Sequence, residues 1–120
     1  MPEAALGAVE ARFADLIWEH APLSSRELVE LAGRELWWKK STTYTVLKKL
    51  CSRGLFRNVD STVSVLVSRE EYYGRQGRQF VQEAFHGSLP RFLAAFAGTE
   101  KLSEGDIAAL EALIRQQRGE

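Results

Sequence analysis

The chain has 120 residues, 45% of them hydrophobic, and its 16 basic and 16 acidic side chains leave a formal net charge of zero. That length and apolar content suit one domain, or a small domain with an oligomerisation arm, and exclude an intrinsically disordered chain. The apolar runs are too short to cross a bilayer, the N-terminus lacks a secretion signal, and the single cysteine, Cys51, excludes an intrachain disulfide. We therefore expect a cytoplasmic protein without membrane insertion.

Two helices are expected before the middle of the chain. Apolar residues recur at helical spacing from about Leu6 to His20, and Pro22 ends that pattern. Ser24-Ser-Arg-Glu27 then forms a capping box, in which hydroxyl and carboxylate satisfy each other's backbone donors, and predicts a second, short helix. A loop from about Gly33 to Lys40 leads to the next element.

The third predicted helix begins at Ser41 and ends at Gly54. Ser41 or Thr42 is expected to cap its N-terminus, and Gly54 supplies the left-handed residue that closes its C-terminus. The residues expected on its buried face are Val46, Leu47, Leu50 and Cys51, with Thr43 also facing the core. Those left outside or on the boundary are Thr42, Tyr44, Thr45, Lys48, Lys49 and Ser52.

Positive charge is concentrated around this helix. From Gly33 to Arg57, seven basic residues stand against Glu35 alone, a local net charge of +6. The preceding segment has two bases and six acids (−4), and the following one has seven bases and nine acids (−2). Because phosphate neutralisation supplies much of the affinity for nucleic acids, the segment predicts a DNA recognition helix; a solvated basic helix face is the alternative.

A β-hairpin is predicted after Gly54. The turn pair Asp60-Ser61 precedes an alternation in which Val63, Val65 and Val67 share one face. Two short helices, a recognition helix and a hairpin make a winged helix-turn-helix over residues 1–67. The wing has no basic residue between Arg57 and Arg69, so we expect it to support the core.

Residues 68–120 are predicted to form a helical dimerisation arm, which makes the fold mainly α with a small β-hairpin wing. Ser68-Arg-Glu-Glu71 starts a long helix up to Gly87, Pro90 begins a short one, and Ser103-Glu-Gly-Asp106 caps the last, which ends near Arg118. The arm is too small for a core of its own, so it should pack on a second copy, or fold back on the winged helix in a monomer. The expected interface residues are Tyr72, Phe80, Phe85, Phe92, Phe96, Ile107, Leu110, Leu113 and Ile114.

Several motifs resemble the penicillinase-repressor family of bacterial transcription regulators (BlaI/MecI/CopY type). They are Glu10, Trp18-Glu19, Trp38-x-x-Ser-Thr-Thr, Leu47-Lys-Lys-Leu-x-x-Arg-Gly-Leu55, Leu66-Val-Ser-Arg-Glu-Glu-Tyr72, Phe92-Leu-Ala-Ala-Phe96 and Lys101-Leu-Ser-Glu104. The resemblance covers almost the whole chain. It implies a homodimeric winged-helix repressor that binds a palindromic operator and blocks transcription, typically of β-lactam resistance or stress genes.

The resemblance also implies a route of induction. In that family a membrane metalloprotease sensor leads to cleavage of the arm between an asparagine and a phenylalanine, and the corresponding bond here is Ala95-Phe96, without the asparagine. A copper-sensing branch carries paired Cys-x-Cys motifs near the C-terminus, and this chain has none. His20 and His86 lack partners at metal-ligand spacing, so neither a metal nor another cofactor is expected.

Residue roles follow from the chemistry of the basic segment. Lysines and arginines contact phosphates, whereas hydroxyls near a recognition helix N-terminus reach base edges. Tyr44 has three possible roles: base contact, stacking on the sugar–phosphate backbone, or packing beneath Trp38. Trp38 is expected in the core and Trp37 partly exposed. The predicted DNA-binding residues are Lys39, Lys40, Ser41, Thr42, Tyr44, Thr45, Lys48, Lys49 and Arg53.

Two functions from different classes remain open. An enzyme is not expected, because the sequence holds no glycine-rich phosphate loop and no nucleophile–base constellation. The basic helix can serve a DNA operator, or it can bind an acidic protein partner in a winged-helix interaction module without sequence-specific DNA binding.

Overall fold

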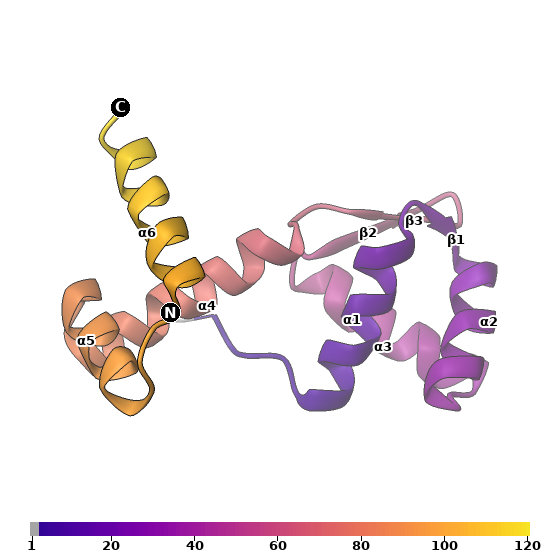
Figure 1. The fold of residues 1–120 in the computed structure, drawn as a ribbon. Coiled ribbons are helices and arrows are strands. Elements are labelled where there is room, and N and C mark those ends of the chain that lie inside the picture. Colours follow the sequence, from indigo (N-terminus) through magenta and orange to yellow (C-terminus); the bar gives the residue numbers. More distant parts are fainter. Residues whose placement is uncertain (1–2) are drawn as a thin grey trace. The chain divides into compact units, whose positions relative to one another are not determined.

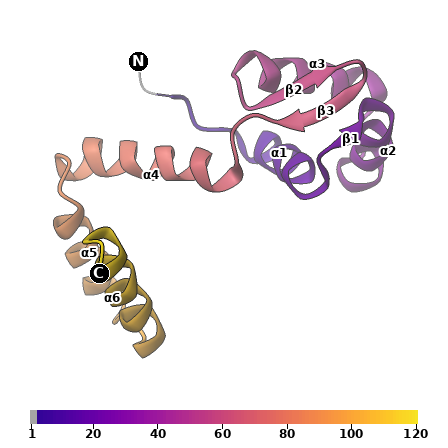
Figure 2. The ribbon, with the colours of Figure 1, turned by 90° about the horizontal axis from the view of Figure 1, so that it is seen from above.

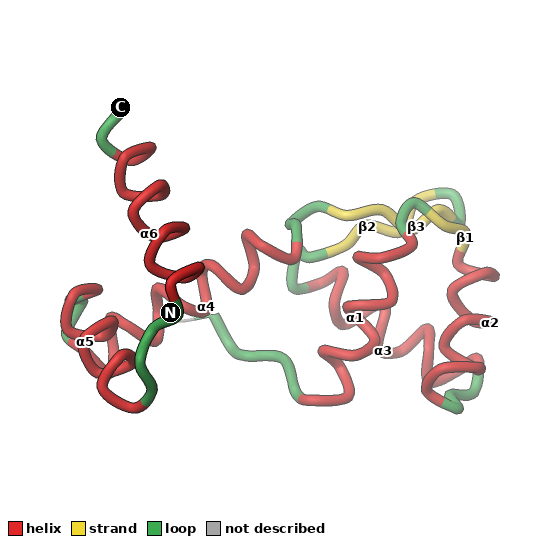
Figure 3. The backbone as a smooth tube through the Cα atoms, in the orientation of Figure 1, coloured by secondary structure: helices red, strands yellow, loops and turns green. Residues whose placement is uncertain are grey.

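The computed structural model describes residues 3–120 and is mainly helical with one small antiparallel sheet, which confirms the predicted fold class (Figure 1, Figure 3). Packing divides the chain into two compact units, with the division between Gln79 and Phe80 inside a helix. The elements are α1 (Ala8–His20), β1 (Leu23–Ser24), α2 (Ser25–Leu36), α3 (Lys40–Ser52), β2 (Phe56–Val59), β3 (Thr62–Val65), α4 (Arg69–Phe85), α5 (Leu89–Thr99) and α6 (Glu104–Gln117).

A single hydrophobic core holds the first unit together. It gathers apolar side chains of α1, α2, α3, the sheet and the start of α4. Helix α3 lies against β2 (Figure 2). Trp38 packs on the edge of this core, its ring 4.9 Å from that of Phe13, as predicted for a tryptophan that fills a core. The buried apolar residues are Phe13, Ala14, Ile17, Leu23, Leu28, Leu31, Ala32, Leu47, Leu50, Leu55, Phe56, Val63 and Tyr72.

Helix α2 begins as predicted and ends later than predicted. The Ser24 side chain accepts a hydrogen bond from the Glu27 backbone N–H at 3.0 Å and caps the helix. The loop predicted from Gly33 to Lys40 is too long, because the helix continues through Leu36, whose half-buried side chain packs on the core. The chain then turns at Trp37, which adopts the left-handed conformation with φ of 61°.

The predicted N-terminal cap of α3 is wrong. Lys39 is the N-cap and makes no side-chain capping bond, so Ser41 and Thr42 lie within the first turn. Burial of Thr43, which is fully covered, fixes the helix in this register. The hydroxyls of Thr43 and Thr45 donate instead to the carbonyls of Lys39 and Ser41, one turn earlier.

The C-terminus of α3 confirms the role predicted for Gly54. Gly54 has φ of 81°, its N–H donates to the Cys51 carbonyl at 2.9 Å, and the Leu55 N–H donates to the Leu50 carbonyl at 3.2 Å. This pair of bonds is a Schellman motif, with Leu50 and Leu55 both buried beside it. The motif turns the chain directly from α3 into β2.

The predicted hairpin is present, but the third strand of its sheet was not foreseen. Strands β2 and β3 pair antiparallel around Asp60 and Ser61, whose positive φ values of 52° and 61° suit a two-residue hairpin turn. Strand β1 adds to β3 and completes a sheet of order β1-β3-β2. Val63 is buried, whereas Val65 is exposed, which departs from the expected alternation.

The regular pairing of the hairpin ends at Val65. The N–H groups of Leu66 and Val67 both donate to the Leu55 carbonyl, at 3.0 and 3.2 Å, so the alternation is interrupted before Val67. The carbonyl of Val67 in turn accepts a hydrogen bond from the Trp18 indole at 2.9 Å. The hairpin therefore fastens to α1, in agreement with the supporting role expected of it.

The remaining helices begin where the sequence predicts. Ser68, Ser88 and Ser103 accept hydrogen bonds from the backbone N–H groups of Glu71, Arg91 and Asp106, at 3.0, 3.2 and 3.0 Å. Tyr72, however, was expected in a dimer interface and is fully buried in the first unit. Its ring lies 5.0 Å from that of Tyr73 and 6.0 Å from that of Trp18, so it has no surface to offer a partner.

Candidate nucleic-acid interface

The outer face of α3 carries the side chains predicted to meet DNA. Ser41, Thr42, Thr45 and Lys48 are all exposed. The Thr45 hydroxyl donates to the Ser41 carbonyl at 2.9 Å, so this side chain presents its methyl group and oxygen lone pairs outward. Hydroxyls and a threonine methyl are groups that can read base edges in a major groove.

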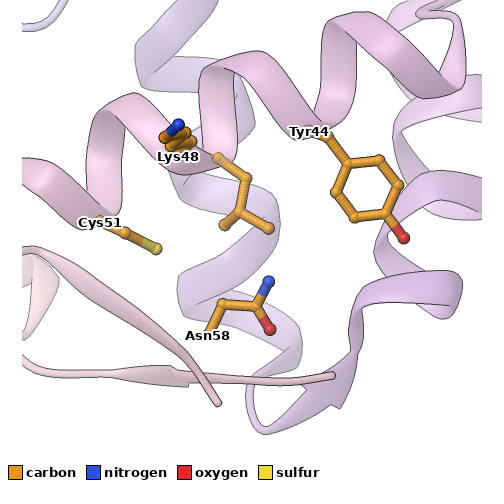
Figure 4. A pocket seen from close by; sticks show the side chains of 5 residues that line it. Tyr44, Lys48, Cys51 and Asn58 are labelled. Carbon is orange, nitrogen blue, oxygen red and sulfur yellow. The ribbon is translucent and has the colours of Figure 1, made fainter. Parts of the chain in front are cut away.

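One edge of α3 faces the hairpin. Lys40, Tyr44 and Lys48 follow one another at a spacing of four residues and therefore share this edge. A hollow between α3 and β2 is lined by Tyr44, Leu47, Lys48, Cys51 and Asn58, and Asn58 faces α3 from the hairpin (Figure 4). Sequence reasoning missed Asn58, because only the strand register places its amide opposite the helix.

A second hollow lies where α2, α3 and the hairpin turn meet. Arg26, Lys40 and Ser61 line it together with Tyr44, whose hydroxyl donates to Ser25 Oγ at 3.4 Å. The other lining residues are Ser24, Ser25, Val29 and Glu30. Arg26 was also missed; its position in the first turn of α2, beside the capping box, is the signal that could have found it.

Tyr44 therefore does not pack beneath Trp38, which was one of the alternatives. The Trp38 ring contacts Phe13, and the Tyr44 side chain is directed toward Ser25 with about a third of its surface exposed. The aromatic face of Tyr44 remains available at the edge of α3. Base contact and stacking on the sugar–phosphate backbone stay as predictions.

The opposite edge of α3 is occupied by contacts within the molecule. Lys49 Nζ lies 2.8 Å from the Glu10 carboxylate, and the Arg53 guanidinium donates to the carbonyl of Ala4. Both residues were predicted as phosphate contacts. Each already has a partner that DNA would have to displace, so phosphate contact by these two residues stays a prediction.

The carboxylate of Glu10 is adapted to this position. It accepts from Lys49 and also from the backbone N–H of Gly7 at 3.1 Å. The hydrogen bond from Lys49 has the larger effect and that from Gly7 the smaller, and together they lower the pKa of Glu10 below its ordinary value of 4.5. A charged carboxylate therefore stays beside α3 at neutral pH.

The lysines near α3 that have no ion-pair partner in the described chain form its positively charged surface. Within residues 3–120, Lys39, Lys40 and Lys48 are exposed and form no ion pair. They lie before, at the start of, and in the middle of α3, on its outer face and the edge nearest the hairpin. The positive surface is thus shifted toward the hairpin relative to the sequence prediction.

Cys51 lines the same hollow without the features of a reactive thiol. It is half-buried, and desolvation by burial raises its pKa above the ordinary value, so the unreactive protonated form dominates at neutral pH. Among the described residues, no three His, Cys, Asp or Glu side chains are grouped as a metal ion would require. Within the same residues, no helix is long and apolar enough to cross a membrane.

Comparison with known proteins agrees with this arrangement. The sequence matches the penicillinase-repressor family over residues 6–116, which includes nearly all of both units. The chain belongs to the penicillinase-repressor family. A penicillinase repressor of Bacillus licheniformis is 21% identical over 107 residues, which cover 86% of this chain and 84% of that protein. The chain is therefore a transcriptional regulator of the penicillinase-repressor type.

The Glu10–Lys49 pair predicts a pH dependence of stability. Because the folded-state pKa of Glu10 is lowered, its contribution is fully present above about pH 5 and is lost as the pH falls through the folded-state value. We expect the melting temperature of the chain to exceed that of a Glu10→Gln variant at pH 7 and to approach it near pH 3. The free energy of unfolding of the two proteins should differ by less than about 1 kcal/mol at pH 7, because Lys49 is 62% exposed and solvent screens the pair.

A Glu19→Gln variant on the same helix is the control, because Glu19 is exposed and has no ion-pair partner within residues 3–120. Thermal unfolding between about pH 3 and 7 compares the three proteins. Equal pH profiles of the chain and Glu10→Gln would show that the pair does not stabilise the fold.

Proposed function

We propose that this regulator binds a palindromic operator as a homodimer and represses transcription. The observation that carries the proposal is the outer face of α3, where the exposed residues Ser41, Thr42 and Thr45 lie beside Lys39, Lys40 and Lys48, which form no ion pair within residues 3–120. A helix on a winged-helix scaffold that combines hydroxyls with phosphate-binding cations is suited to a major groove. The membership of the penicillinase-repressor family supports the same reading.

The lysines supply affinity and the hydroxyls supply discrimination. Each lysine that neutralises a phosphate releases condensed counterions, which makes binding depend on salt but not on sequence. Ser41, Thr42 and Thr45 carry no charge, so their contribution depends on which bases they face. Loss of a lysine should therefore change the salt dependence of binding, whereas loss of a hydroxyl should change its sequence dependence.

A Lys48→Ala variant tests the DNA-binding face. We expect its affinity for the native promoter duplex to fall several-fold, and the slope of log Kd against log salt to decrease by about 0.9, the share of one phosphate contact. Fluorescence anisotropy of labelled promoter and scrambled duplexes at several salt concentrations measures both. Lys101→Ala is the control, since Lys101 is an exposed lysine of the second unit with no ion pair in the described chain.

Lys49→Ala provides a second comparison. Because Lys49 is paired with Glu10, its removal should change the salt slope less than removal of Lys48. Salt-insensitive binding of the unmodified protein to every duplex would contradict the operator proposal. Undiminished operator binding by a Lys48→Ala, Lys49→Ala variant would show that these two lysines do not contact the DNA, whereas equally weak binding to promoter and scrambled duplexes would favour a winged-helix module that binds a protein partner.

The proposal of a dimer is supported by the second unit, Phe80–Glu120, which has no buried residue. Phe80, Phe85, Phe92 and Phe96 contact one another through ring pairs 5.5–6.0 Å apart, yet Phe80 and Phe96 remain more than half exposed. An apolar groove between α5 and α6 is lined by Phe92, Leu93, Phe96, Leu102, Asp106, Ala109, Leu110 and Leu113.

So much exposed apolar surface on 41 residues favours association. The four apolar residues predicted for the interface on α6 differ in exposure. Ile107 and Leu110 are half-buried, whereas Leu113 and Ile114 are about half exposed. The exposed members are therefore the ones we assign to the interface with a second copy. The half-buried members line the inside of the unit.

A Leu113→Asp variant tests the interface. A carboxylate at this apolar position should weaken dimerisation by tenfold or more, because its desolvation costs over about 1.4 kcal/mol. Sedimentation equilibrium measures the monomer–dimer constant, and Ala108→Asp, an exposed residue of the same helix that does not line the groove, is the control. A monomer at tens of micromolar unmodified protein would instead support an arm folded back on the winged helix.

We also propose that the inducing signal acts on this arm. Ala95 and Phe96 lie within α5, both exposed, so the bond between them is accessible in position but helical in conformation. A protease needs local unfolding of such a segment before it can cut. Phe92 and Phe96, whose rings are 6.0 Å apart, would resist that opening.

Mass spectrometry of the protein recovered from its host bacterium, before and after exposure to an inducing β-lactam, tests this route. We expect two fragments that divide at Ala95-Phe96, in step with derepression. Full derepression with only intact chains present would show that the signal acts through another change in the arm.

A further inference from the structure

Trp37, in the turn between α2 and α3, combines two features that do not help the chain to fold. Its side chain is 90% exposed, so the indole forfeits the stabilisation that burial would give. Its backbone has φ of 61° and ψ of 28°, a left-handed conformation that crowds the Cβ of any residue except glycine and is tolerated best by asparagine. Strain together with exposure points to a use outside the fold.

The turn holds the backbone of Trp37 in place. The Trp37 N–H bonds to the Ala32 carbonyl, and the Trp38 N–H approaches the same oxygen at 3.4 Å. Leu36 and Trp38, on either side, both pack against the core. The fold therefore sets the direction in which the Trp37 side chain leaves the backbone, which lowers the entropic cost of presenting it to a ligand.

The surroundings of Trp37 favour a polyanionic ligand. Arg34, Lys39 and Lys40 lie within three residues, and none of them forms an ion pair within the described chain, while Glu35 is the one acid among residues 33–40. Lys40 opens α3, and three residues of chain separate its Cα from that of Trp37 by at most about 11 Å. A duplex whose phosphate meets Lys40 therefore comes within reach of the indole.

We propose that Trp37 packs on the deoxyribose–phosphate backbone of duplex DNA at the border of the half-site that α3 meets. Deoxyribose offers apolar surface to the indole rings, and a phosphate oxygen can accept the indole N–H. The inference rests on the proposed operator binding and extends it, because it assigns affinity to an uncharged residue outside the recognition helix.

The absence of charge gives the test a distinct signature. A Trp37→Ala variant should bind the promoter duplex roughly tenfold more weakly at every salt concentration, with an unchanged slope of log Kd against log salt. Trp37→Phe should recover part of the loss. Lys48→Ala, measured beside them, should lower the slope, which separates an apolar contact from a phosphate ion pair.

A Trp37→Gly variant links the contact to the strained backbone. Glycine relieves the left-handed strain, so we expect its melting temperature to rise by roughly 2–6 °C while its DNA affinity falls as that of Trp37→Ala does. A more stable protein that binds DNA less well cannot be explained by damage to the fold.

The outcomes separate this inference from the proposed function. Tight, salt-dependent binding by the unmodified protein with no loss in Trp37→Ala overturns the role of Trp37 and leaves operator binding intact. A reduced salt slope in Trp37→Ala also overturns it, because the substitution would then act by displacing the lysines. No DNA binding by the unmodified protein overturns both.

Discussion

The packing of α3 on the core of the first unit is the contact on which the DNA-binding face depends. Thr43, Leu47 and Leu50 each leave at most 2% of their surface exposed, and their burial fixes the rotation of the helix about its axis. At 3.6 residues per turn, Thr45 and Lys48 must then point outward. A rotation that exposed Leu47 would direct lysines toward the core, where an unpaired charge costs several kcal/mol. The position of the exposed hydroxyls and lysines is thus set by hydrophobic burial on the other side of the helix.

The same helix also explains how a chain with no net charge can offer a positive surface. Two of its bases, Lys49 and Arg53, are bound to Glu10 and to the Ala4 carbonyl, which ties the end of α3 to α1 and to the N-terminal segment. The N-terminal segment also contacts the first half of α4. The Tyr72 hydroxyl donates to the same Ala4 carbonyl at 3.3 Å and accepts from the Leu6 N–H at 3.1 Å.

Further along α4, the two carboxylate oxygens of Glu3 lie 3.2 and 3.3 Å from Arg75. Residues 3–6 therefore form a strap that joins the C-terminal end of α3 to the helix that leads into the arm. The bases of the first unit have two separate uses as a result: those at the end of α3 hold the unit together, and those near its start remain available to a ligand.

How far the sequence predicted this structure depends on the range of the interactions involved. The caps at Ser24 and Ser103 and the end of α3 at Gly54 were predicted, because each rests on hydrogen bonds between residues at most five apart. Strand β1 was not foreseen, since its two residues are a strand only through pairing with Thr62 and Val63.

The burial of Tyr72 and the engagement of Lys49 were missed for the same reason. Their partners, Leu6 and Glu10, lie 66 and 39 residues away, and no local pattern announces them. The residues predicted to meet DNA were correct in their exposure along α3 up to Lys48. The partners of Lys49 and Arg53 at the end of α3 were not foreseen, because the tertiary fold supplies them.

The two units differ in how their stability is supported, and this difference matters for regulation. The first unit has a core that closes on itself, whereas the second has aromatic rings in contact but no residue fully covered. On the proposed function, the second unit gains its missing cover from another copy, so its order depends on protein concentration. Two half-sites bound by a linked pair hold far more tightly than two separate units, because the second contact becomes intramolecular. A signal that opened α5 would therefore need no contact with α3: by dissolving the pair it would remove the avidity and release the operator, while the first unit stayed folded.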